Sequence, residues 1–268
     1  MKPMPTPVAR MLNKVPEVTL YFWVIKIMAT TVGETAADFL SVTMNLGTIG
    51  TDLIMSTLLA LALAAQIRLR KYVPSIYWIA VVLISVVGTL VTDTLVDRLG
   101  VSLQTTTVVF SLALVATFVA WFASERTLSI RTIVSTRREL FYWAAVLFTF
   151  ALGTAAGDLM AESFALGYAT AGIIFGALIG AAALAHYVFG ANTVLTFWIA
   201  YILTRPFGAS FGDLLSQPLA NGGLGLGTAM TSQVFLAVIL ALVTFLTVTR
   251  RDALAVVLEP DDEAHNLN

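Results

Sequence analysis

The sequence predicts an all-α integral membrane protein whose eight transmembrane helices form four tandem helix-pair repeats. Of the 268 residues, 58% are hydrophobic and only 12% are charged, which is too apolar for an ordinary soluble domain. One motif also occurs four times with unchanged spacing: a Trp, a Gly ten residues later and an Asp five residues after that. The copies are Trp23/Gly33/Asp38, Trp78/Gly88/Asp93, Trp143/Gly153/Asp158 and Trp198/Gly208/Asp213. A fixed spacing of this kind indicates internal repeats.

Eight apolar segments are long enough to cross ~30 Å of hydrocarbon. The first, at 19–40, carries the motif, and the second, at 48–67, opens after a Leu-Gly pair. The same order predicts helices at 75–96 and 103–123, then at 140–161 and 168–188, and finally at 194–216 and 227–248. Residues 58–65 do not alternate between apolar and polar, as a transmembrane β-strand would.

The repeats group into two pseudo-symmetric halves. The tryptophans are 55, 65 and 55 residues apart, so the first and third copies are separated by the same distance as the second and fourth. We expect a first half at 1–130, a second half at 131–251 and a disordered cytoplasmic tail at 252–268. A two-helix unit returns the chain to its starting side, so the repeats are parallel, and the four motif helices should surround an axis along the membrane normal.

Basic residues predict the orientation of the chain. They gather in the N-terminal arm, in the loops after the second and fourth helices, and at the C-terminus, whereas the opposite loops carry only Arg98. By the positive-inside rule we expect both termini on the cytoplasmic side of the membrane. The chain has no cysteine and only two histidines, His186 and His265, which excludes thiolate metal sites and argues against a multi-histidine centre.

Four tandem two-helix units, each with its tryptophan, resemble the bacterial DUF347-repeat membrane proteins. The resemblance covers nearly the whole chain and implies an eight-helix membrane protein. It implies no activity and supplies no catalytic residues, so the chemistry has to come from the residues themselves.

Each motif residue has a structural interpretation. The four tryptophans (Trp23, Trp78, Trp143 and Trp198) begin their helices and are typical of an interfacial aromatic belt. The four glycines (Gly33, Gly88, Gly153 and Gly208) each precede a small residue by four positions, which favours close helix packing. The four aspartates lie about 22 Å beyond the tryptophans. They could cap the outer turns by accepting backbone N–H bonds, or they could have a function.

Polar stripes favour a function. Stepping back by fours from each Asp follows one helix face. That face carries Lys26, Thr30 and Glu34 in the first copy, Ser85 and Thr89 in the second, Thr154 in the third and Arg205 in the fourth. Lipid would reject such faces, so they should point inward. The remaining embedded acid is Asp52, on the second helix, which could converge with Glu34 and Asp38.

These acids predict a path for a cation or for protons. The path would consist of Glu34, Asp38, Asp52, Asp93, Asp158 and Asp213, with Lys26 and Arg205 as counter-charges. Lys26 could instead snorkel to the cytoplasmic face, and Arg205 could simply pair with an aspartate across the bundle. If a metal binds, Glu34 and Asp38 are its expected ligands, and oxygen ligands suit a divalent cation such as Mn²⁺ or Mg²⁺. Pro206 should kink the seventh helix.

The function that these features favour is a small secondary transporter or exporter of a cation, with manganese or protons as candidates. The alternative is a non-transporting membrane scaffold or partner-binding subunit whose aspartates are structural caps. An enzyme is not expected, because no nucleophile–base pair or phosphate-binding loop is present. The expected partners are the lipid bilayer and a small inorganic cation or proton, with no nucleic acid and no resident cofactor. The small-residue face at Gly172, Gly176 and Gly180 would permit a homodimer.

Overall fold

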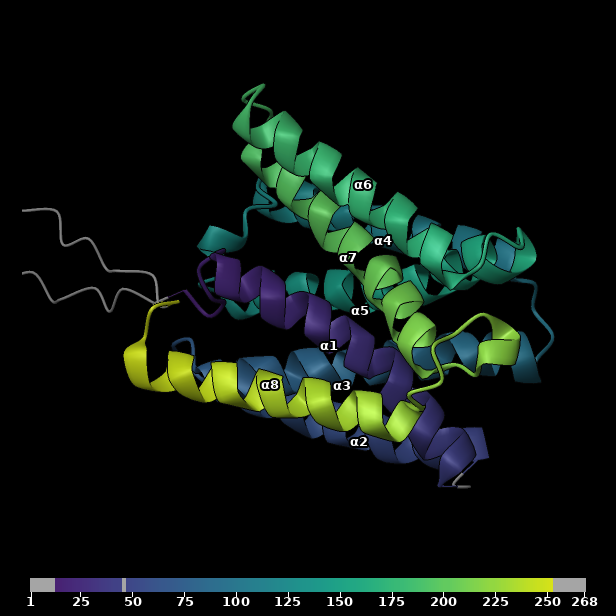
Figure 1. Cartoon of the computed structure of the whole chain (residues 1–268). Coiled ribbons are helices and arrows are strands. Elements are labelled where there is room, and N and C mark those ends of the chain that lie inside the picture. The colour runs from purple at the N-terminus through teal and green to yellow at the C-terminus, as the bar shows by residue number, and fades with distance from the viewer. Residues whose placement is uncertain (1–12, 45–46, 253–268) are drawn as a thin grey trace, which may run out of the picture.

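A computed structural model describes residues 13–44 and 47–252 and shows an all-helical chain, with no strand in that part. The odd-numbered helices are α1 (Leu20–Asp38), α3 (Pro74–Asp93), α5 (Thr136–Asp158) and α7 (Thr193–Ser216). The even-numbered helices are α2 (Gly47–Arg68), α4 (Leu103–Glu125), α6 (Tyr168–Tyr187) and α8 (Thr228–Thr249). The bounds therefore follow the predicted segments closely (Figure 1).

Side chains and a proline define where several helices begin. Thr19, Ser102, Ser135 and Asn192 each accept a backbone N–H from the first turn of the helix that follows, as N-caps do. Pro74 occupies the first turn of α3, where its missing N–H costs nothing. Pro206 lies in the interior of α7, beyond the first turn.

Three of the odd helices continue past the motif aspartate in a wider winding. Short π-helices follow directly: η1 (Phe39–Thr43) after α1, η2 (Thr94–Arg98) after α3 and η4 (Leu159–Ser163) after α5. After α7 the chain instead turns through a short 3₁₀ helix, η5 (Leu219–Asn221). Asp38, Asp93 and Asp158 therefore lie where the helix changes from α to π geometry. Single π-turns are often found beside functional sites.

Seven of the described helices are long and apolar enough to cross a membrane, which indicates a membrane protein. The helix outside this group is α1, because it carries Lys26, Glu34 and Asp38 within its nineteen residues. The expected eighth crossing is therefore not established by length and apolarity.

The helices form an inner ring and an outer layer. Each odd helix contacts the next one along the chain, and α7 contacts α1, so that the four enclose a common axis. Each even helix packs on the odd helix that follows it: α2 on α3, α4 on α5 and α6 on α7, while α8 closes the set by packing on α1 (Figure 1). The even helices are the more exposed, as helices facing lipid would be.

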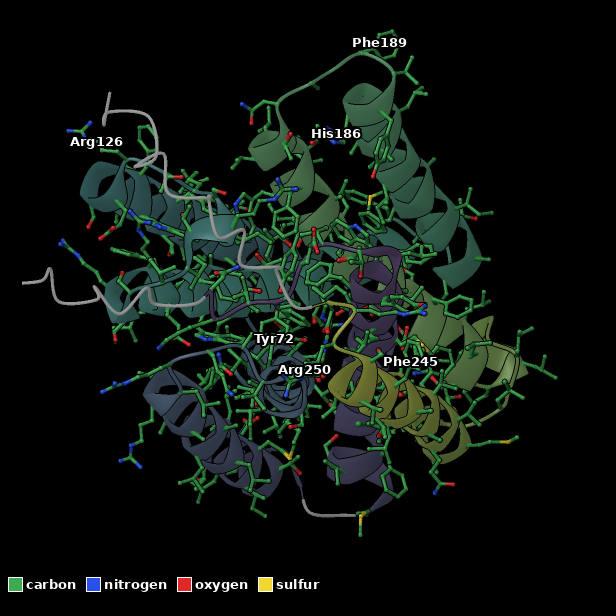
Figure 2. The ribbon with its side chains drawn as sticks, turned by 90° about the vertical axis from the view of Figure 1, so that its left-hand side faces the viewer. Tyr72, Arg126, His186, Phe189, Phe245 and Arg250 are labelled. Carbon is green, nitrogen blue, oxygen red and sulfur yellow. The ribbon has the colours of Figure 1, made fainter. Side chains whose placement is uncertain are left out.

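The chain ends of the helix pairs meet on one face of the bundle. Tyr72, Arg126, His186 and Arg250, which lie before or after successive pairs, are all on this face (Figure 2). Every pair thus returns the chain to the same end. We refer to this face as the basic end and to the opposite face, with Asp97 and Glu162, as the acidic end.

A buried polar cluster holds the basic end together. The Lys14 ammonium donates to the Glu139 carboxylate over 2.6 Å and to the Ile67 carbonyl over 3.0 Å, and all parts of this ion pair are buried. The Gln66 amide donates to the same carboxylate. The segment before α1 is thereby fixed to the end of α2 and the start of α5.

The C-terminal end of α8 is fixed to the same face. The Tyr72 hydroxyl donates to the Asp252 carboxylate over 2.5 Å, and the Glu17 N–H donates to the Asp252 carbonyl over 2.8 Å. Burial raises the pKa of the Tyr72 hydroxyl and, likewise, the pKa of the Asp252 carboxyl. Apart from Asp252, the tail that was predicted to be disordered lies outside the described residues, as does the start of the first half, residues 1–12.

Candidate functional site: the axis of the inner ring

Four glycines bring the inner helices into close contact. A Cβ atom added at any of them would overlap an atom of the neighbouring odd helix. The glycines and the residues they face are Gly33 with Ser85, Gly88 with Phe150, Gly153 with Arg205 and Gly208 with Thr30. Each facing residue lies three positions before the motif glycine of its own helix. The repeated glycine is therefore the notch at which one inner helix fits against the next.

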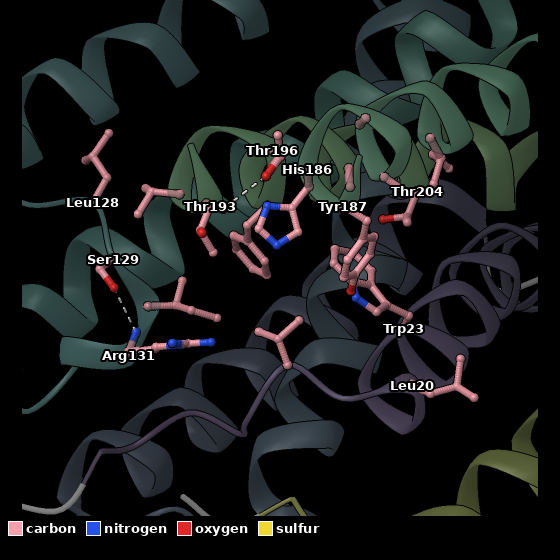
Figure 3. A pocket seen from close by; sticks show the side chains of 18 of the residues that line it. Leu20, Trp23, Leu128, Ser129, Arg131, His186, Tyr187, Thr193, Thr196 and Thr204 are labelled. Atoms are coloured by element: carbon pink, nitrogen blue, oxygen red, sulfur yellow. Dashed lines mark hydrogen bonds between the residues drawn. The ribbon is translucent and has the colours of Figure 1, made fainter. Parts of the chain in front are cut away.

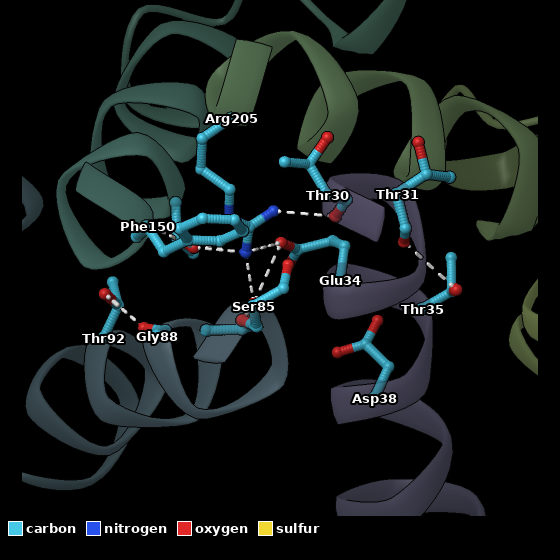
Figure 4. A network of polar contacts seen from close by, with 12 residues as sticks. Thr30, Thr31, Glu34, Thr35, Asp38, Ser85, Gly88, Thr92, Phe150 and Arg205 are labelled. Atoms are coloured by element: carbon cyan, nitrogen blue, oxygen red, sulfur yellow. Dashed lines mark hydrogen bonds and ion pairs between the residues drawn. The ribbon is translucent and has the colours of Figure 1, made fainter. Parts of the chain in front are cut away.

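The centre of the ring is occupied by Arg205, whose side chain is fully buried. One of its terminal nitrogens lies 2.9 Å from the Glu34 carboxylate and 2.6 Å from the Thr154 hydroxyl, and it also bonds the Thr89 hydroxyl. Its other terminal nitrogen donates to the Thr30 carbonyl over 3.0 Å (Figure 4). A guanidinium with five fixed donors suits such convergent contacts from several helices.

Three of these four contacts come from equivalent positions of the repeats. Glu34, Thr89 and Thr154 each directly follow the motif glycine, in α1, α3 and α5. The corresponding residue in α7 is Ala209, on the helix that carries Arg205 itself. The fourth repeat therefore inserts a cation where the other three present polar groups. The ion pair of Arg205 with Glu34 joins α7 to α1 across 171 residues of sequence.

The carboxylates gather on the acidic side of Arg205. Ligand atoms of Glu34, Asp158 and Asp213 all lie within 4.8 Å of one another. The Asp38 carboxylate lies one turn further along α1, on the same side as Glu34 (Figure 4), and accepts a 3.5 Å bond from the Gln217 amide. A candidate metal-binding group of Glu34, Asp158 and Asp213 therefore lies beside the predicted metal pair, Glu34 and Asp38.

Exposure increases along this face toward the acidic end. Arg205 is fully buried, Glu34 is 5% exposed, and Asp213 is 7% exposed. Asp38, Asp93 and Asp158 are partly exposed, and Asp97 and Glu162 are exposed. The acids therefore form a graded series from the surface of the acidic end to the central guanidinium.

Capping does not account for the aspartates. Among the hydrogen bonds of the described residues, none runs from a backbone N–H to the carboxylate of Asp38, Asp93, Asp158 or Asp213. Asp158 and Asp213 instead lie beside Glu34, and Asp38 lies on the same side of α1 as Glu34. Such close negative charges need protons, bases or a bound cation for balance.

Lys26 lies on the other side of Arg205. Its ammonium is fully buried, 4.1 Å from the ring centres of both Phe150 and Tyr201, and it donates to the Thr204 hydroxyl over 3.3 Å. The interpretation in which Lys26 snorkels to the membrane surface is therefore wrong. In the described part of the chain it has no carboxylate within 4 Å, and the groups that lie over its nitrogen are the ring faces of Phe150 and Tyr201.

Aromatic side chains fill the axis between Lys26 and the basic end. The hydroxyls of Tyr77 and Tyr142 lie 2.5 Å apart, and the rings of Phe22 and Phe197 are 6.1 Å apart. All four are buried. They occupy equivalent positions, sixteen residues before each motif aspartate, so further stepping by fours along the sequence would have located this layer.

The tryptophans do not form the expected aromatic belt. Trp78, Trp143 and Trp198 are buried, and Trp23 is half-buried. Trp198 donates its indole N–H to the Leu128 carbonyl over 2.9 Å. The cause is the neighbouring aromatic layer, against which the indoles stack edge to face, as Trp78 does with Tyr77 and Trp143 with Tyr142.

Two further predicted site residues, Asp52 and Ser85, form hydrogen bonds with threonine hydroxyls of α3 or η2. The Asp52 carboxylate, on α2, accepts a 2.7 Å bond from the Thr94 hydroxyl at the start of η2. Ser85 lies at the notch of Gly33 and accepts the Thr89 hydroxyl through its backbone carbonyl. Sequence reasoning had not singled out Thr204, which joins Lys26 to the wall of a lateral cavity, because one threonine in an apolar helix gives no signal.

Two described cavities lie beside the ring. One, of about 600 Å³, lies between α1, α6, α7 and the segment 128–131; the other, of about 310 Å³, lies between α1, α2, α3 and α8. None of the axial carboxylates lines either cavity.

Comparison with protein-family models finds four matches to one description, "Repeat of Unknown Function (DUF347)". The matches cover residues 21–72, 76–127, 141–192 and 196–252, one for each helix pair. No curated protein and no solved structure matches the chain.

Proposed function

Because this chain belongs to the DUF347 repeat family, whose description assigns no activity, we propose a function from its own geometry: a secondary transporter that moves a small inorganic cation along the axis of the inner ring. The observation that carries the proposal is the charge balance on that axis. Glu34, Asp38, Asp93, Asp158 and Asp213 lie near one another, whereas Arg205 is paired with Glu34 alone among them. Such a group is stable only with added positive charge, which a transported cation or protons would supply.

Oxygen ligands define the class of cargo. Glu34, Asp158 and Asp213 offer carboxylate oxygens close enough to share one ion, and the neighbouring threonine hydroxyls are also oxygen donors. Such donors suit a hard or borderline divalent cation, with Mn²⁺ and Mg²⁺ as the leading candidates. Proton exchange at the same carboxylates is the expected means of coupling.

The two halves of the axis would have different tasks. The acidic half is graded in exposure and would admit the ion, whereas Arg205, Lys26 and the aromatic layer would close the axis toward the basic end. We assign α1 as the eighth membrane crossing, because α3, α7 and α8 surround it and keep its charges from lipid. The basic end would face the cytoplasm of a bacterial cell, with both termini on that side.

The test is ion flux into liposomes that contain the purified protein, with Mn²⁺, Mg²⁺ and protons measured separately. The variants are Glu34→Gln, Asp158→Asn and Asp213→Asn, and the control is Glu125→Gln, an acid at the basic end that pairs with Arg138. Even supporting groups around a metal ligand contribute 10- to 100-fold, so each site variant should lose at least about tenfold of the flux. The control should keep it.

The Asp158 and Asp213 variants distinguish a loss of transport from misfolding, because neither residue takes part in the ion pair of Arg205 with Glu34. Background flux for all three ions in the wild type, or equal flux in the wild type and all site variants, would contradict transport. A scaffold role would then be the remaining explanation.

A further inference from the structure

The larger lateral cavity, of about 600 Å³, has the size of a small-molecule site and opens beside the inner ring (Figure 3). Its walls come from α1, α6, α7 and the segment 128–131. Most of the lining is apolar, including Leu20, Ile27, Ile179, Val194 and Phe197. An apolar cavity between helices suits a hydrocarbon chain.

The polar part of the cavity is cationic. Arg131 and His186 are the basic residues in its described lining, and the lining includes no Asp or Glu. Arg131 is exposed and has no carboxylate within 4 Å in the described part of the chain, whereas Arg137 and Arg138 nearby share Glu125. The hydroxyls of Thr193 and Thr196 lie on the same side of the groove (Figure 3). This end is complementary to an anion.

The cationic end also lies where a membrane surface would be. Tyr187 and Phe189, at the end of α6, are 83% and 77% exposed, and His186 and Phe189 lie on the basic end of the bundle (Figure 2). Exposed aromatic side chains at a helix end are typical of the headgroup level. From there the groove runs along α6, whose exposed surface is apolar, toward the membrane interior.

We propose that this cavity is a binding site for an anionic phospholipid from the surrounding membrane, with the phosphate at Arg131 and His186 and one acyl chain in the groove between α1, α6 and α7. His186 holds its Nδ1 against the Ala191 carbonyl at 3.2 Å, so Nε2 is the nitrogen left for the headgroup. The combination of an apolar groove and an acid-free cationic mouth selects a charged amphiphile over a neutral one.

The bound chain would touch the axial network. Thr204 lines the cavity, and its hydroxyl accepts the hydrogen bond from Lys26. The Thr30 hydroxyl, one turn further along α1, lies 3.2 Å from the Thr204 carbonyl. A lipid in the groove therefore lies one hydrogen bond away from the column of buried polar residues, although its binding does not depend on cation transport.

The test compares lipid binding to the purified full-length protein in detergent. Phosphatidylglycerol and phosphatidylcholine with the same acyl chains are added, and the retained lipid is counted by native mass spectrometry while the melting temperature is followed. We expect one phosphatidylglycerol to be retained and to raise the melting temperature more than phosphatidylcholine does. Arg131→Gln should weaken phosphatidylglycerol binding about fivefold, the effect of one basic residue near an anionic lipid.

The matched control is Arg126→Gln, which removes an exposed charge from the same connecting segment but not from the cavity. It should bind phosphatidylglycerol like the wild type. Ala183→Trp, which would fill the groove from α6, should abolish retention of both lipids. Equal binding of the two lipids, equal effects of Arg131→Gln and Arg126→Gln, or the full stabilisation from inorganic phosphate alone would each overturn the proposal.

Discussion

Replacing Gly88 by alanine should destabilise the protein, although alanine is the better helix former. A Cβ atom at Gly88 would lie 2.8 Å from the Phe150 Cβ and 3.1 Å from the Ala151 backbone nitrogen. Neither atom can rotate away, so α3 and α5 would have to separate. Overpacking of this kind costs about 1–3 kcal/mol. The loss of unfolded-chain freedom on changing glycine to alanine offsets about 0.4–1 kcal/mol of that cost.

Gly180 provides the matched control. It lies within α6, is exposed, and has nothing within 4 Å of an added Cβ. Gly180→Ala should therefore gain about 0.4–1 kcal/mol, so the two variants should differ by the overpacking cost of about 1–3 kcal/mol. The assay is reversible denaturant unfolding in the same detergent for both variants. Equal changes in the free energy of unfolding would refute the idea that the repeated glycine is a contact notch.

Two further predictions concern buried charges. Glu34→Gln and Arg205→Met should each lower the free energy of unfolding by about 3–5 kcal/mol, because each leaves a buried charge unpaired. In denaturant unfolding, the double variant should lose about 0.5–3 kcal/mol less than the sum of the two single losses. Strictly additive losses would show that the two residues are not coupled. Because burial raises the pKa of the Asp252 carboxyl, the folded state holds that proton more tightly than the unfolded chain, whose pKa is about 3.9. The stability that Asp252 contributes is therefore present below that value and is lost as the pH rises through the raised pKa. From acidic to neutral pH, the melting temperature should fall less for Asp252→Asn than for the wild type. An equal fall in both proteins would contradict this prediction.

Seven of the described helices could be predicted because they are longer and more apolar than a soluble helix needs to be, and α1 could be predicted because it carries the repeated Trp–Gly–Asp motif. The predicted and observed ends of α4, α6, α7 and α8 agree within two residues, since turn residues and caps surround each apolar run. The family resemblance is also confirmed by the four matches to the DUF347 repeat. The π-helical continuations after the motif aspartates could not be foreseen, because no residue pattern distinguishes them from an ordinary last helical turn.

The face of each inner helix could be predicted, but its partners could not. Stepping by fours located Glu34, Thr89, Thr154 and Arg205 on faces that do converge, because that spacing follows directly from helix geometry. Which acid Arg205 would pair with depends on contacts between distant segments, and one sequence carries no record of them. Lys26 was misjudged for the same reason, since the rings that cover its ammonium come from α5 and α7.

The position of α1 in the ring has a consequence for how the protein is made. On the proposed topology α1 crosses the membrane, yet Arg205, the partner of Glu34, follows 171 residues later, and α8, which covers its flank, follows α7. A charged residue at the centre of a lone inserted helix costs roughly 2.5–3.5 kcal/mol. On that topology, α1 would be held less firmly in the bilayer until the fourth repeat supplies Arg205 and α8.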